Sequence, residues 1–186
     1  MAYLTRAQAI SASQPAWGTK TAAESAVTKS MSTPDSTDFD VFLSHSYEDA
    51  ETIAGVARLL EADALSVYVD WAVDRQLDRS VVTPDTAQLL RTRMDHCYFL
   101  LFVSSSASPK SKWMPWELGY FDGRHQGRIG ILPIVERAGH GFQGQEYLEI
   151  YPSYEIVELI EFGNQLARST SATKARMLRT EAKRPG

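Results

Sequence analysis

The apolar run Cys97–Val103 constrains the fold more than any other stretch of this sequence. Its residues, CYFLLFV, do not alternate with polar ones. A strand with one face in water shows such alternation, so this run predicts a strand buried on both faces, as in a parallel sheet covered by helices. Cys97 is the only cysteine. We expect it to be a buried, inert thiol, which leaves no disulfide framework and no cysteine-based metal site.

Segments with strand and helix patterns alternate along the rest of the chain. Predicted strands are 39–43, 65–69, 97–103, 128–135 and one within 146–157 that follows a short helical turn. Predicted helices are 48–64, 83–95, 111–123 and 157–167. Thr83 is a good N-cap for the second of these helices, with Pro84 at its first position. The alternation predicts an α/β fold with a five-stranded parallel sheet and helices on both faces.

Length and charge limit the remaining possibilities. The chain has 186 residues, and we divide it into an N-terminal arm or linker (1–37), one domain (38–167) and a basic C-terminal tail (168–186). A formal net charge of −4 gives no reason to expect nucleic-acid binding. The longest apolar runs are much shorter than the roughly 20 residues of a membrane span, and the start lacks a signal-peptide pattern. We therefore expect a cytoplasmic location.

Polar residues follow the predicted strands at points that a parallel sheet brings to one rim. Ser44, His45 and Ser46 end the first strand, and Asp70 and Trp71 end the second. The run 104–106 is all serine and ends the third strand. Ligands of such sheets bind at the carboxyl ends of the strands. This rim is the predicted site.

Glu117 lies on the helix that follows this serine run. Pro115 fits the first turn of the helix, and Trp113 lies four residues before Glu117 on the same face. We expect the helix dipole to favour a carboxylate in the first turn and keep it ionised. Its aromatic neighbours can instead desolvate it and raise its pKa; they are Trp113, Trp116, Tyr120 and Phe121. Two interpretations stay open. Glu117 and its aromatic neighbours can serve chemistry on a ring-bearing substrate, or the aromatic residues can be core and Glu117 can favour only the helix start.

Several common chemistries do not fit the sequence. A hydrolase triad is disfavoured because His45 lies between Ser44 and Ser46 on a strand, where adjacent side chains point to opposite faces. Gly139, Gly141 and Gly144 lack the strand-then-helix setting of a phosphate-binding loop. The histidines show no metal-ligand spacing, so no metal is expected. Serines also stand where a phosphoacceptor receiver domain would need acidic residues.

A lone carboxylate does fit cleavage of the N-glycosidic bond to a nicotinamide. Glycosidases usually need a second carboxyl group to protonate the leaving oxygen. The nicotinamide of NAD⁺ is already cationic and leaves neutral, so no general acid is required. One ionised Glu can stabilise the ribosyl cation that remains, and aromatic side chains can hold a flat ring.

Three stretches in this order resemble Toll/interleukin-1 receptor (TIR) domains. They are Phe39–Ser46 with Glu48 and Asp49, then Val67–Trp71 with the polar loop after it, and Ser111–Gly123 with the W-x-x-x-E spacing of Trp113 and Glu117. The resemblance covers about residues 38–161. More narrowly, the chain is similar to stand-alone bacterial TIR proteins, including those of Thoeris-type antiphage systems.

The resemblance implies a flavodoxin-like fold and an NAD⁺ hydrolase or cyclase that releases nicotinamide and makes an ADP-ribose-derived signal in antiviral defence. It implies Glu117 as the catalytic carboxylate and NAD⁺ as substrate, with no cofactor. Partners would be further copies of the chain and a separate effector that responds to the product. Alternatives are a non-catalytic TIR scaffold and a nucleoside deoxyribosyltransferase-like enzyme. The residues expected at the substrate are Phe42, Ser44, His45, Asp70, Trp71, Arg75, Ser104 and Trp113.

Overall fold

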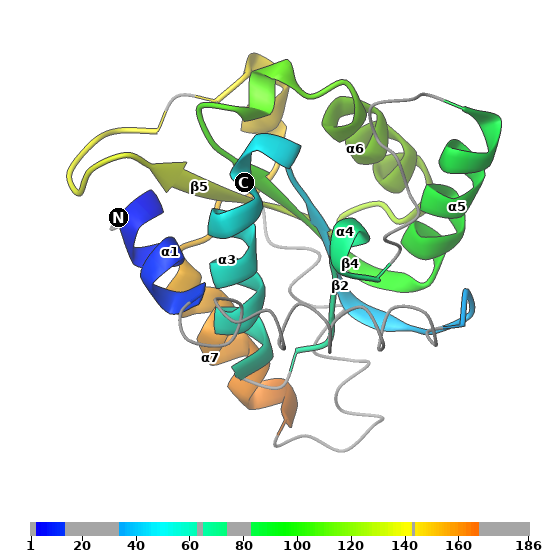
Figure 1. Cartoon of the computed structure of the whole chain (residues 1–186), viewed down its shortest axis with the longest axis horizontal. Coiled ribbons are helices and arrows are strands. Elements are labelled where there is room, and N and C mark those ends of the chain that lie inside the picture. The colour runs from blue at the N-terminus through cyan, green and yellow to red at the C-terminus, as the bar shows by residue number, and fades with distance from the viewer. Residues whose placement is uncertain (1–2, 14–33, 63–64, 74–82, 143, 168–186) are drawn as a thin grey trace.

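A computed structural model describes residues 3–13, 34–62, 65–73, 83–142 and 144–167 (Figure 1). Within this part, five parallel strands form a sheet in the order β1-β5-β4-β2-β3. The strands are β1 (Leu4–Thr5), β2 (Phe39–Ser44), β3 (Val67–Tyr68), β4 (Cys97–Ser104) and β5 (Ile129–Val135). The α-helices are α1 (Arg6–Ser13), α3 (Ala50–Ala62), α4 (Asp70–Val73), α5 (Pro84–Asp95), α6 (Trp113–Arg124) and α7 (Ile156–Ala167). The 3-10 helices are η1 (Tyr47–Asp49), η2 (Ser108–Lys110) and η3 (Glu146–Ile150).

The central strands β2 and β4 are buried on both faces. Val41 and Leu43 of β2 pack in a cluster with α3, whereas Phe42 between them packs on the opposite face with α5 and α6. In Figure 1, α1, α3 and α7 accordingly lie on one side of the sheet and α5 and α6 on the other. Successive side chains of a strand point to opposite faces, so the middle of a strand covered on both faces is a nearly continuous apolar run. The predicted α/β class and parallel five-stranded sheet are confirmed.

The order of the strands reverses between β2 and β4. The chain runs from β2 to its neighbour β3 and then crosses to β4 on the other side of β2. A crevice forms outside the carboxyl ends of strands at such a reversal, and ligands of open α/β sheets bind there. Ser44 and Ser104 are the last residues of β2 and β4. The topology therefore places the predicted rim at the reversal point.

The prediction of a strand within 146–157 is wrong. Its short helical turn is present as η3, but after it the segment makes only an isolated bridge between Ser153 and Ile131. The Ile131 N–H donates to the Pro152 carbonyl, and the Tyr154 N–H donates to the Ile131 carbonyl. Pro152 has no N–H with which to extend the ladder. The pattern of apolar residues here reflects packing of Tyr154 and Ile156 in the core.

The N-terminal residues supply the fifth strand instead. In β1, Leu4 pairs with Ile134 and Thr5 with Val135, at the outer edge of β5. Helix α1 then packs against α3 at Gly55, where there is no room for a side chain: a Cβ atom would lie 1.8 Å from the Ala9 carbonyl oxygen. Residues 3–13 of the expected arm thus pack on their own domain. Residues 14–33 and the tail 168–186 lie outside the described part, and the domain boundaries stay a prediction.

Substituting Gly55 tests the close approach of α1 to α3. We expect Gly55→Ala to lower the free energy of unfolding by about 1–3 kcal/mol, because the new methyl group overpacks the helix contact. The measurement is urea unfolding. The control is Gly119→Ala, on an exposed part of α6 with no atom within 4 Å of the added Cβ, and it should be neutral or stabilising by up to about 1 kcal/mol. Equal stability of the two variants would contradict the packing.

Candidate active site

Helix α6 carries Glu117. The helix begins at Trp113, and Pro115 lies in its first turn as predicted. Glu117 is the fifth residue of α6, and the first turn contains no acidic residue. The expected placement in the first turn is therefore wrong, and the dipole at the helix start stabilises this carboxylate less than we expected, since the effect fades within one turn.

A hydroxyl from β2 stabilises the Glu117 carboxylate. The Ser44 Oγ donates a hydrogen bond of 2.6 Å to Glu117 Oε2. Both residues have an exposed fraction of 0%. A buried carboxylate is costly unless donors replace its lost water, and a hydrogen bond to a charged oxygen is short and strong. The structure thus brings together two residues that lie 73 positions apart in the chain, at the reversal point of the sheet.

His45, Asp70 and Trp71 form a second group, at the ends of β2 and β3. The Trp71 Nε1–H donates to His45 Nε2 at 3.0 Å, and His45 Nδ1 lies 2.7 Å from the Leu43 carbonyl oxygen. A carbonyl only accepts, so we assign the proton to Nδ1, which leaves Nε2 free to accept from Trp71. His45 Nε2 also lies 3.3 Å from Asp70 Oδ1. His45 is 1% exposed and orients Trp71.

The other predicted site residues take different positions. Phe42 stacks on Tyr68 in the core, with ring centroids 5.1 Å apart. Trp113 is 7% exposed and meets Trp116 edge to face. Ser104 is buried at the end of β4. Arg75 lies outside the described residues. Phe42 and Trp113 therefore lie in the core between the sheet and the helices α5 and α6.

Sequence reasoning missed a buried carboxylate that organises the loop between β4 and α6. Asp49 Oδ2 accepts a hydrogen bond of 2.5 Å from the Ser105 Oγ, and Asp49 Oδ1 accepts one of 2.9 Å from Arg6 Nη1. The serines of this loop carried a signal, since serine hydroxyls bind nearby backbone groups in turns. Asp49 was part of the family resemblance, but nothing in the sequence indicated its burial, because acidic residues at a helix start are ordinarily solvated.

Comparison with known proteins decides the family. Residues 41–161 match the TIR domain family. The chain belongs to the TIR-domain family. The matched segment contains Ser44, Asp49 and Glu117 and excludes β1 and α1.

Two relatives of this TIR protein have names that specify a product. "Probable 3' cyclic ADP-D-ribose synthase ThsB'" of Bacillus cereus (strain MSX-D12) is 50% identical over 115 residues, which cover 61% of this chain and 59% of the relative. "Putative cyclic ADP-D-ribose synthase TIR2" of Cytobacillus dafuensis is 34% identical over 83 residues, which cover 44% of this chain and 22% of the relative. The chain thus matches less than two thirds of the length of either relative.

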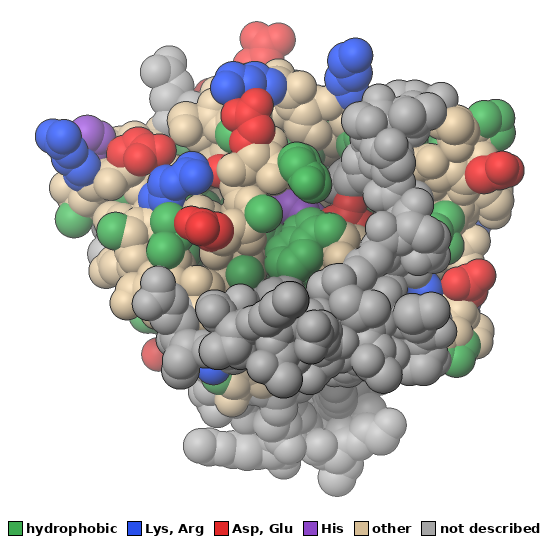
Figure 2. All heavy atoms as spheres, viewed as in Figure 1, with side chains coloured by type: hydrophobic (Ala, Val, Ile, Leu, Met, Phe, Trp, Pro, Cys, Tyr) green, Lys and Arg blue, Asp and Glu red, His purple; other side chains and the backbone are tan. Residues whose placement is uncertain are grey.

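The described residues of the TIR protein contain neither a metal-binding group nor a membrane-spanning helix. Among them, no three His, Cys, Asp or Glu side chains are grouped so that they could hold a metal ion. None of the described helices is both long enough and apolar enough to span a bilayer. On the face seen in Figure 2, acidic and basic side chains are interspersed. This face therefore differs from the basic stripe that tracks a nucleic-acid backbone.

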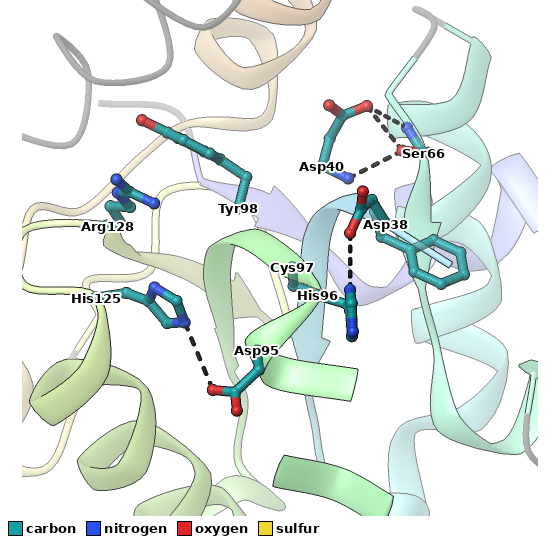
Figure 3. A pocket seen from close by; sticks show the side chains of 10 residues that line it. Asp38, Asp40, Ser66, Asp95, His96, Cys97, Tyr98, His125 and Arg128 are labelled. Atoms are coloured by element: carbon teal, nitrogen blue, oxygen red, sulfur yellow. Dashed lines mark hydrogen bonds and ion pairs between the residues drawn. The ribbon is translucent and has the colours of Figure 1, made fainter. Parts of the chain in front are cut away.

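A polar cavity of about 460 Å³ lies at the amino ends of the strands, opposite the predicted site at their carboxyl ends (Figure 3). Its walls come from the amino ends of β2 and β4, the end of α5 and the residues before β5. His96 Nδ1 lies 2.8 Å from Asp38 Oδ1, and His125 Nε2 lies 3.9 Å from Asp95 Oδ1. No residue of the predicted site lines this cavity. Cys97 also borders it, and burial raises the pKa of this thiol, in keeping with the expected inert cysteine.

Removing the Ser44 hydroxyl tests its role at Glu117. We expect Ser44→Ala to lower the free energy of unfolding by about 1.5–3 kcal/mol, because a buried carboxylate loses a donated hydrogen bond. Denaturant unfolding at neutral pH measures this. Ser106→Ala is the matched control, since the Ser106 hydroxyl is exposed and makes a longer hydrogen bond of 3.3 Å to Glu136. A loss no larger than that of the control would show that Ser44 does not stabilise the charge.

His125 should make stability depend on pH. Burial, followed by the positive charge of Arg128, lowers the pKa of His125 below its ordinary value of 6.5. The unfolded chain then takes up this proton before the folded chain does, so folding stability falls as pH drops below about 6.5. We expect His125→Gln to weaken this loss between pH 7.5 and 5.5 in thermal unfolding. His140→Gln, at an exposed histidine, should leave the pH dependence as in the unmodified protein.

Proposed function

We propose that this TIR protein cleaves NAD⁺ between nicotinamide and ribose and converts the ADP-ribosyl part into a signal in antiviral defence. The observation that carries the proposal is the buried Glu117 carboxylate in contact with Ser44 at the reversal point of the sheet. The names of the two relatives, which both specify a cyclic ADP-D-ribose synthase, support the same class of product.

The chemistry needs little beyond one negative charge. The bond between the ribose C1′ and the nicotinamide nitrogen breaks, and its electron pair leaves with nicotinamide, which becomes neutral. Glu117 stabilises the positive charge that develops on the ribosyl ring. A hydroxyl of the same ADP-ribose then attacks C1′ and releases a proton, which gives a cyclic product. If water attacks instead, the product is linear ADP-ribose, and if another small molecule attacks, it is a conjugate.

The burial of Glu117 sets a condition for substrate entry. Its side chain is 0% exposed, and its Oε2 is bonded to Ser44. A ribose hydroxyl can take the place of the Ser44 hydroxyl on this oxygen, since both are donors. Trp71, held by His45 and beside Asp70, is the partly buried aromatic side chain that we propose for contact with the flat ring of the substrate.

We also propose that copies of the chain self-associate and that a separate effector responds to the product. Self-association would explain how substrate reaches Glu117, which is fully buried in the single chain, because contacts between copies can move the residues that cover it. The same burial favours the alternative of a non-catalytic scaffold, in which Glu117 serves only the fold. An activity measurement separates the two functions.

The test is nicotinamide release from NAD⁺ by the purified protein. We expect release by the unmodified chain, rising more than linearly with protein concentration, and a loss of about 100-fold or more in Glu117→Gln, which keeps the shape but removes the charge. The control Glu51→Gln changes an exposed carboxylate on α3 and should retain activity. Mass spectrometry identifies the product. Equal release by Glu117→Gln and the unmodified protein would refute the site, and cleavage of deoxynucleosides in place of NAD⁺ would indicate a deoxyribosyltransferase.

A further inference from the structure

We propose that Arg6, from the N-terminal strand and helix, is a positioning residue for the active site. It acts through Asp49 on the loop that joins β4 to α6, and so on the start of the helix that carries Glu117. The effect on catalysis rests on the proposed function, whereas the effect on the loop does not. The contacts that support this lie outside the pair Ser44–Glu117 and involve a segment that precedes the residues matched to the TIR family.

Asp49 is the centre of this arrangement. Its side chain is 2% exposed, whereas that of Arg6 is 35% exposed. Each carboxylate oxygen has one partner in the described part of the chain: Oδ1 bonds Arg6 Nη1 and Oδ2 bonds the Ser105 hydroxyl. A buried carboxylate needs donors in place of its lost water, and a cationic donor stabilises the charge more than a neutral one does. Arg6 therefore places a positive charge beside the buried Asp49 side chain.

The Ser105 side chain in turn holds the loop together. Its Oγ accepts from the Ala107 N–H at 3.0 Å, and its own N–H donates to the Ser108 Oγ at 2.9 Å. Ser108 is fully buried, and its hydroxyl donates to the Val103 carbonyl at the end of β4. The loop thus folds around the Ser105 hydroxyl, which donates to Asp49.

The same loop sets where α6 begins. The Ser111 N–H donates to the Ser108 carbonyl, and the Ser111 Oγ accepts from the Met114 N–H in the first turn of the helix. Glu117 follows one turn later on this helix. A shift of Ser105 is therefore passed through adjoining hydrogen bonds to the base of α6.

The position of Arg6 is fixed by packing. It is the first residue of α1, directly after the two residues of β1 that pair with β5. Helix α1 is seated on α3 at Gly55, where the backbones meet. Asp49 ends η1, which leads directly into α3. The guanidinium and the carboxylate are thus held by two helices that pack on each other.

Loss of the Arg6 charge should loosen the loop before it unfolds the domain. In Arg6→Met we expect amide hydrogen exchange across residues 105–114 to be about tenfold faster or more. We expect kcat for nicotinamide release to fall about tenfold or more with KM changed less than about threefold, because a small misplacement of a catalytic group costs rate rather than binding. Arg6→Lys keeps the charge and should restore most of both values.

The control removes an exposed ion pair from the same loop. Lys110 pairs with Glu48 at 3.0 Å, and both side chains are more than half exposed, so Lys110→Met should leave exchange and kcat near those of the unmodified protein. The coupling is tested in an Asp49→Asn background, where no buried charge needs Arg6. Adding Arg6→Met there should have little further effect on exchange in 105–114.

Two results would overturn the inference. One is an exchange profile of Arg6→Met that matches the unmodified protein in 105–114, and the other is an equal effect of Arg6→Met with and without Asp49→Asn. If Arg6→Met alone does not fold, the double variant and Arg6→Lys still decide between these outcomes. Failure of the unmodified protein to release nicotinamide would refute the proposed function, and the exchange measurements would still test the link from Arg6 to the loop.

Discussion

Burial of the central strands on both faces is the constraint on which the rest of the structure depends. Because β2 and β4 present apolar side chains to helices on each side, polar groups within the sheet region are confined to the strand ends. Ser44 and Ser104 stand at those ends, and the chain continues from each into a polar loop. The location of the site follows from the need to keep hydroxyl and carboxylate groups out of the two cores.

Carboxylates that nevertheless lie inside are stabilised in different ways. Asp40, at the amino end of β2, accepts from the backbone N–H and hydroxyl of Ser66. Glu117 accepts from the Ser44 hydroxyl, and Asp49 has both a hydroxyl and the Arg6 guanidinium. The printed donor to Glu117 is thus a neutral hydroxyl, whereas Asp49 also has a cationic donor.

Much of the fold could be predicted because its signals are local. The run 97–103 predicted a doubly covered strand, and Thr83 followed by Pro84 predicted the start of α5, where the Thr83 hydroxyl accepts from the Thr86 N–H. The strand expected within 146–157 failed because its apolar residues fill the core without a continuous ladder. The fifth strand consists of Leu4 and Thr5. A run of two residues is too short to show a periodic pattern in the sequence.

The sequence by itself determined that polar residues would follow buried strands. It also determined that Glu117 would lie on the helix after the strand at 97–103. These features follow from local composition and from the geometry that parallel sheets share. Only the tertiary structure decided that Ser44 donates to Glu117, that His45 holds Trp71, and that Arg6 reaches Asp49. Such contacts join residues 26 to 73 positions apart, and their formation depends on how helices and strands pack, which no local pattern encodes.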